Sequence, residues 1–91
     1  MDGAQSWRPR LASRARLKFD RVANQQMLLF PEATLILNET GAAIVRLCDG
    51  ARSVEQITGA LAQQFRGVER ETLRREVDAF LESIRARGLL Q

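Results

Sequence analysis

The chain of 91 residues contains no histidine, no tyrosine and a single cysteine, Cys48. Without histidine it lacks the commonest general base and the commonest metal ligand at neutral pH. One cysteine cannot close an internal disulfide, and no Cys/His spacing typical of zinc is present. A reactive thiol needs a cationic neighbour or a helix N-terminus, but Asp49 beside Cys48 is acidic, so we expect Cys48 to pack in the core. These absences predict a chain that is not an enzyme and holds no metal or cofactor.

Long apolar runs are absent as well. No stretch approaches the roughly 20 apolar residues that a membrane span needs, and no apolar signal segment follows Met1. We therefore expect no contact with a membrane and a location in the cytoplasm. The remaining composition, 45% hydrophobic and 27% charged residues, is typical of one small domain with a hydrophobic core.

Positive charge is concentrated at the start of the chain. Residues 1–22 hold six basic and two acidic residues, whereas residues 23–91 hold eight basic and nine acidic residues. Residues 1–14 also show little periodicity, which predicts a flexible basic N-terminal arm before a domain over residues 15–91. Such an arm either steers the chain toward an acidic partner or nucleic acid, or is a solvated tail. The pattern assigns no role to Trp7 within it.

Three short segments have the patterns of β-strands. Residues 16–22 alternate between polar and apolar side chains, which is typical of a half-buried strand. Residues 27–30 form a short apolar run, and residues 33–37 resume after a turn at Pro31. Asn24 suits a left-handed position in the turn between the first two segments. Short strands joined by tight turns predict a small antiparallel sheet.

A helical period follows the strands. Asn38 is suited to cap a first helix, and Gly50 is suited to end it in a left-handed conformation. Ser53 and Gln56 have the spacing of a capping box at the start of a second helix. The third helix is predicted over residues 69–87. Its apolar stripe consists of Leu73, Val77, Phe80, Leu81 and Ile84.

The fold class predicted from this order is α+β, winged-helix-like, with a three-stranded antiparallel sheet followed by three α-helices. Because many winged-helix proteins bind DNA, a DNA-binding regulator is the alternative interpretation. The third helix carries five arginines, but five acidic residues are interspersed with them, which largely cancels the attraction to phosphate. Nucleic acid is therefore not the expected partner.

The segment 33–37 offers a different kind of site. Three strands cannot close a barrel, so the sheet must have two edges. If residues 33–37 form an edge, their backbone groups can pair with an extended peptide, and the third helix can form the opposite wall. The alternatives are that these residues are only core, or that the edge is covered by the N-terminal arm or by a second copy in a homodimer.

Several residues together resemble the PqqD family, pyrroloquinoline quinone (PQQ) biosynthesis protein D. The resemblance covers about residues 15–90. It rests on the runs Leu28-Leu29-Phe30-Pro31-Glu32, Leu37-Asn38-Glu39-Thr40-Gly41 and Leu47-Cys48-Asp49-Gly50, with Ile44, Val54 and Ile57 between and behind them.

The resemblance implies a peptide chaperone rather than an enzyme. The family binds the precursor peptide PqqA and presents it to the radical SAM enzyme PqqE, which cross-links a glutamate and a tyrosine of that peptide; no quinone is expected to bind the chaperone. In related recognition domains the peptide is added as a strand beside the third strand and packs on the third helix. Carried over to this sequence, the peptide-binding residues are Ala33, Thr34, Leu35, Ile36 and Leu37 of the strand and Val77, Phe80, Leu81 and Ile84 of the helix.

Overall fold

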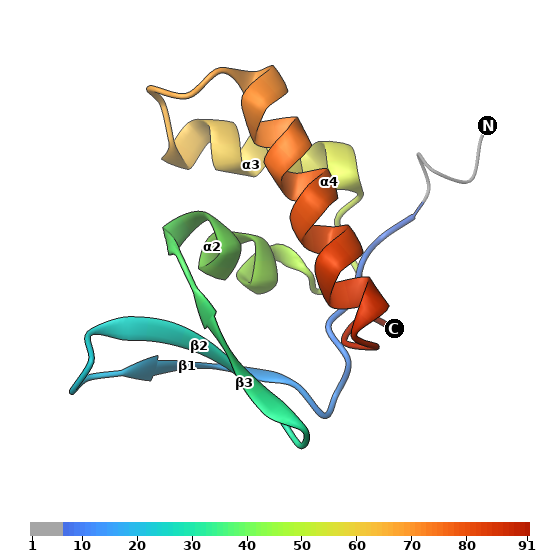
Figure 1. Cartoon of the computed structure of the whole chain (residues 1–91). Helices are drawn as coiled ribbons and strands as arrows, with labels where there is room; N and C mark the ends of the chain where they lie inside the picture. Colours follow the sequence, from blue (N-terminus) through green and yellow to red (C-terminus); the bar gives the residue numbers. More distant parts are fainter. Residues whose placement is uncertain (1–6) are drawn as a thin grey trace.

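The computed structural model describes residues 7–91, which form one sheet and three helices. The strands are β1 (Arg16–Asp20), β2 (Gln25–Phe30) and β3 (Ala33–Leu37). They are followed by the helices α2 (Glu39–Leu47), α3 (Val54–Gln64) and α4 (Arg70–Ala86). Figure 1 shows the helices gathered on one side of the sheet. The predicted fold, a three-stranded antiparallel sheet followed by three helices, is confirmed.

The sheet has the order β1-β2-β3, and both pairs of neighbours are antiparallel. Its register places Leu17, Leu28 and Leu35 in one row on the face toward the helices, where Leu28 is fully buried. The opposite face carries Met27 and Ile36 and is not covered by the helices, since 62% of Ile36 is exposed. Asn24 has a positive φ of 56° in the first turn, as predicted.

Two of the three helices begin at side-chain caps that the sequence predicts. Asn38 accepts a hydrogen bond from the Gly41 backbone N–H (2.7 Å). Ser53 and Gln56 form both hydrogen bonds of a capping box at the start of α3. The prediction that Gly50 ends α2 directly is wrong, because the helix stops at Leu47. The positive φ of Gly50 (80°) instead turns the chain toward the N-terminal segment, and its N–H donates to the Pro9 carbonyl.

The N-terminal segment is docked onto the domain from residue 7 onward. The Leu11 N–H donates to the Cys48 carbonyl (3.0 Å), and the Ala12 N–H donates to the Leu89 carbonyl (2.7 Å). Pro9 is fully buried. Within the predicted flexible arm, residues 9–12 thus form backbone hydrogen bonds to segments distant in sequence. Residues 1–6 of the predicted arm lie outside the described residues.

The core joins the inner face of the sheet to all three helices. From α4 it receives Leu73, Val77, Leu81 and Ile84, which are almost completely buried. The helices between residues 7 and 91 include none that is long and apolar enough to cross a membrane.

Candidate peptide-binding site

β3 forms one edge of the sheet, and β1 forms the other. Within residues 7–91 no strand pairs with the outer side of β3, and the docked N-terminal segment bridges to Asp49 and Leu90 instead. β1 carries the charged residues Arg16, Lys18 and Asp20, whereas β3 has no charged residue and no proline. Charge at an edge is a common protection against unwanted pairing. The edge of β3 is therefore the one open to an added strand.

The hairpin geometry indicates which backbone groups face this edge. Pro31 and Glu32 form a two-residue connection between the paired residues Phe30 and Ala33. We expect such a connection to close on a hydrogen-bonded pair, after which hydrogen-bonded and non-hydrogen-bonded pairs alternate. The backbone N–H and C=O groups of Thr34 and Ile36 then point away from β2, toward the free edge.

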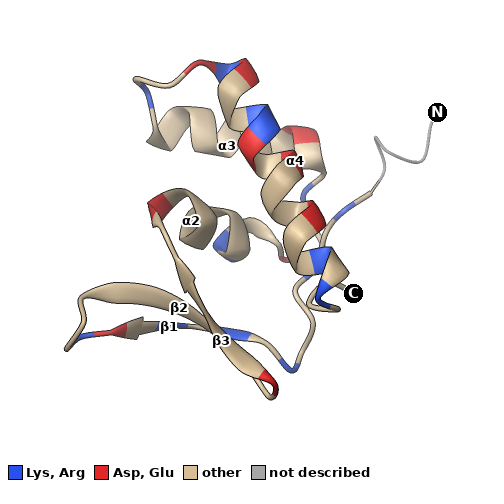
Figure 2. Cartoon of the chain, viewed as in Figure 1, with Lys and Arg blue, Asp and Glu red and all other residues tan. Residues whose placement is uncertain are grey.

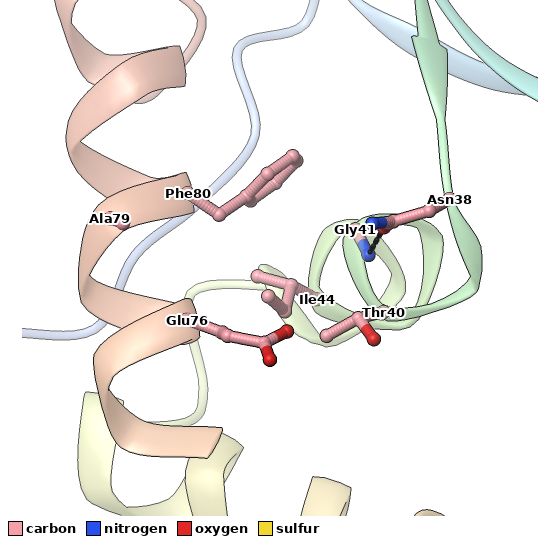
Figure 3. A pocket seen from close by; sticks show the side chains of 7 residues that line it. All are labelled: Asn38, Thr40, Gly41, Ile44, Glu76, Ala79 and Phe80. Carbon is pink, nitrogen blue, oxygen red and sulfur yellow. Dashed lines mark hydrogen bonds between the residues drawn. The ribbon is translucent and has the colours of Figure 1, made fainter. Parts of the chain in front are cut away.

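Two adjoining hollows lie beside α4, the first next to this edge of β3 and the second next to the start of α2. The first has a volume of about 220 Å³. It is lined by Leu35, Ile36, Leu37, Asn38, Phe80 and Ser83. The second has a volume of about 300 Å³ and is shown in Figure 3. It is lined by Asn38, Thr40, Gly41, Ile44, Glu76, Ala79 and Phe80. Because both hollows include Asn38 and Phe80, we treat them as one feature, the β3–α4 groove.

Phe80 lies at the centre of the groove. Its ring points from α4 toward the start of α2 (Figure 3). A Cβ added at Gly41 would lie 3.1 Å from Phe80 Cε1 and 3.2 Å from the Asn38 Oδ1 that caps α2. Because Gly41 has no side chain, the Phe80 ring and the Asn38 side chain can both pack closely against its backbone.

The far end of the groove is tied together by Arg14. Its guanidinium forms an ion pair with Glu32 in the turn before β3 (2.9 Å) and donates to the Gly88 carbonyl after α4 (3.2 Å). These contacts are exposed and contribute little stability individually. They do connect the start of β3 to the end of α4, which fixes one end of the groove.

The predicted helix wall is largely wrong. Val77, Leu81 and Ile84 are 0%, 2% and 0% exposed, so they belong to the core and not to the surface of the groove. Only Phe80 among the four predicted helix residues lines the groove. The sequence prediction treated residues 73–84 as one apolar stripe, although a helix turn places Phe80 beside that stripe and not within it.

Further groove residues were missed from the sequence. On α4 they include the polar residues Glu76 and Ser83, which lie four residues before and three residues after Phe80 and therefore share its face. Their polar character hid them in a search for apolar contacts. Ala33 to Leu37 do form the edge strand, and their contact with a peptide stays a prediction.

All four arginines of α4 are paired with acidic side chains. Arg74 contacts Glu55 (2.9 Å) and Asp78 (3.2 Å), and Arg70 contacts Glu55 (2.8 Å). The hydrogen bond and charge of Arg70, with the charge of Arg74, hold the pKa of the exposed Glu55 carboxyl below its usual value. Figure 2 shows blue and red mixed along α4. This arrangement gives no basic stripe for nucleic acid.

Cys48 does not offer a nucleophile. Burial, with a smaller contribution from the negative charge of Asp49, raises the pKa of its thiol to about 12. The thiol is therefore protonated at neutral pH and packed in the core. Across residues 7–91 no group of three or more Cys, Asp or Glu side chains is placed to hold a metal ion.

Known proteins resemble this chain over most of its length. Residues 25–90 match the family model of coenzyme PQQ synthesis protein D (PqqD). The "PqqA binding protein" of Rhodopseudomonas palustris (strain TIE-1) is 38% identical over 87 residues, which cover 96% of this chain and 84% of that protein. The protein of the same description from Azotobacter vinelandii is 34% identical over 83 residues, which cover 91% of this chain and 88% of that protein.

A bifunctional relative and a relative of known structure also resemble this chain. The bifunctional coenzyme PQQ synthesis protein C/D of Methylorubrum extorquens is 42% identical over 57 residues, which are 63% of this chain and 15% of that protein. The solution structure of the PqqD truncation of Methylobacterium extorquens PqqCD, described as a stand-alone recognition element for ribosomally synthesised and modified peptides, has a TM-score of 0.77. It is 31% identical and covers 91% of this chain and 87% of that one. With a fold, a family model and curated relatives that agree over most of its length, the chain belongs to the PqqD family.

Proposed function

We propose that this chain binds the precursor peptide PqqA as an added strand in the β3–α4 groove and presents it to the radical SAM enzyme PqqE. The free, uncharged edge of β3 facing Phe80 is the observation that carries the proposal. Backbone pairing at such an edge supplies affinity, and alternate side chains of the peptide enter pockets that supply specificity. The curated relatives described as PqqA binding proteins support this peptide, and the solved recognition element supports peptide binding in general.

The chain acts as an adaptor and leaves the chemistry to its partner. The thiol of Cys48 is buried and protonated, and among residues 7–91 the side chains that line the groove include one ionisable group, Glu76. A ribosomally made peptide is available in the cytoplasm, where the adaptor meets it before modification. The function needs no cofactor on this chain.

A proline substitution in β3 tests strand addition directly. Ile36→Pro removes the N–H that we expect at the free edge and places the proline ring there, while the ladder between β2 and β3 keeps its hydrogen bonds. One hydrogen bond contributes about 0.5–1.5 kcal/mol, and the ring also displaces the peptide backbone. We expect the affinity for PqqA, measured by isothermal titration calorimetry, to fall at least about tenfold.

Ile36→Ala is the matched control, because it removes the same exposed side chain and keeps the N–H. It should bind PqqA within about threefold of the unsubstituted chain. If the alanine and proline variants bind equally well, strand addition at β3 is wrong. Circular dichroism verifies that both variants stay folded.

A homodimer that pairs the β3 edges of two copies would use the same backbone groups. Light scattering over a range of chain concentrations detects such a dimer. Because the two uses compete, PqqA must shift the chain toward monomer if the dimer forms through β3.

A further inference from the structure

Glu76 differs from the other acidic residues within α4. The helix holds four acidic residues. Three form ion pairs with arginines of the same helix: Glu71 with Arg75, Asp78 with Arg74, and Glu82 with Arg85. Among the residues that the structure describes, Glu76 pairs with no basic side chain, and of the four only Glu76 lines the β3–α4 groove. Its carboxylate extends from α4 toward Thr40 and Ile44 of α2 (Figure 3).

The spacing between Glu76 and Phe80 matches that of an extended peptide. Four residues of helix advance by about 6 Å. Two residues of a strand advance by about 6.6 Å and return the side chain to the same face. A peptide strand along the groove can therefore place one side chain against Phe80 and the side chain two positions away against Glu76.

The directions of β3 and α4 determine which of these two peptide residues comes first in the peptide sequence. Ser83 and Phe80 line the groove beside β3, whereas Phe80 and Glu76 line it beside Asn38 and the start of α2. α4 thus runs opposite to β3. A peptide antiparallel to β3, which forms the more stable ladder, passes Glu76 before it passes Phe80.

We propose that Glu76 selects a lysine or arginine of the bound peptide, located two residues before a bulky apolar residue that contacts Phe80. The proposal rests on the proposed function and adds the charge and register of the peptide to it. An unpaired carboxylate beside an apolar hollow complements such a residue, because the cation binds the carboxylate while its methylene chain covers apolar surface. The other role open to Glu76 is to stabilise the N-terminus of α2 through the helix dipole.

A double-mutant cycle between chain and peptide separates these roles. The probes are PqqA and synthetic variants in which each lysine or arginine is replaced, one at a time, by glutamine. Calorimetry at about 50 mM salt compares their binding to the unsubstituted chain and to Glu76→Gln. We expect one substitution, two residues before an apolar residue, to weaken binding to the unsubstituted chain about three- to fivefold and to leave binding to Glu76→Gln unchanged.

Glu71→Gln is the control, since it removes the same charge from the outer face of the same helix. It should retain the preference for the basic residue in full. As a positive test, Glu76→Lys should bind more tightly to the peptide whose selected basic residue is replaced by glutamate than to PqqA itself.

The proposal is overturned if every peptide substitution has the same effect on the unsubstituted chain and on Glu76→Gln. It is also overturned if the coupled basic residue lies at another spacing, or if Glu76→Gln changes only the stability of the chain. These outcomes leave the proposed function standing, provided that Ile36→Pro still lowers the affinity for PqqA by at least about tenfold. Failure of the unsubstituted chain to bind PqqA at all would refute the proposed function instead.

Discussion

Phe80 and Leu81 are neighbours in sequence, but the structure gives them different roles. Leu81 is 2% exposed and belongs to the core. Phe80 is only partly buried and lines both hollows of the groove. We predict that Leu81→Ala chiefly lowers stability and that Phe80→Ala chiefly lowers the affinity for PqqA.

The magnitudes follow from burial. Replacing a buried leucine by alanine costs about 2–5 kcal/mol, because apolar contacts are lost and a cavity remains. A domain of this length has a free energy of unfolding of about 5–14 kcal/mol, so the loss is a large fraction of the total. Removing the ring of Phe80 enlarges hollows that are already open to solvent, and we expect it to cost about 1–1.5 kcal/mol.

For the affinity for PqqA the order should be reversed, with Phe80→Ala losing more than Leu81→Ala. An aromatic side chain at the centre of a binding groove typically contributes 2 kcal/mol or more, which corresponds to about a 30-fold loss of affinity on truncation. The folded fraction of Leu81→Ala should bind PqqA within about threefold of the unsubstituted chain, because Leu81 does not reach the groove.

Urea unfolding followed by circular dichroism measures the stability of both variants, and Trp7 provides a second signal as the one tryptophan of the chain. Calorimetry measures the affinity for PqqA at a temperature where both variants are folded. The assignment of Phe80 to the groove is refuted if Phe80→Ala loses as much stability as Leu81→Ala, or if it binds PqqA at full affinity.

Two further predictions concern the docked N-terminal segment and the buried thiol. A chain that starts at residue 13 should lose about 2–6 kcal/mol of unfolding free energy relative to one that starts at residue 7, because the four backbone hydrogen bonds that link residues 9–12 to distant segments disappear; equal urea midpoints would contradict this docking. Because the pKa of Cys48 is raised from 9.0 to about 12, the unfolded chain loses its thiol proton first as the pH rises. Stability should be unaffected by this group below pH 9 and fall between pH 9 and about 12. Because the chain has no tyrosine, Cys48→Ala should abolish most of the alkaline loss seen by thermal unfolding, and an unchanged loss would exclude Cys48 as its origin.

Features set by local chemistry could be predicted from the sequence. The alternation of side chains predicted β3 with its bounds at Ala33 and Leu37, because a strand has a period of two. The cap at Asn38 and the capping box at Ser53 were predicted because each depends on residues within one helical turn.

Features set by distant contacts could not be predicted. Residues 9–12 are held by hydrogen bonds between backbone groups, which leave no pattern in the side chains. Leu81 lies on the side of α4 that meets the core and Phe80 does not. The sequence does not distinguish them, because both residues are apolar. Glu76 resembles its acidic neighbours until the ion pairs of those neighbours are known.

The energetics of strand addition explain why the helix side of the groove matters. We expect Thr34 and Ile36 to offer two donors and two acceptors at the free edge, and four such hydrogen bonds contribute about 4 kcal/mol in total. Ordering a disordered peptide costs about 2–5 kcal/mol, so backbone pairing alone yields almost no net affinity. Backbone pairing also does not distinguish one peptide from another. Both the affinity and the choice of peptide must therefore come from side chains, and the groove offers Phe80 beside β3 and Glu76 beside the start of α2.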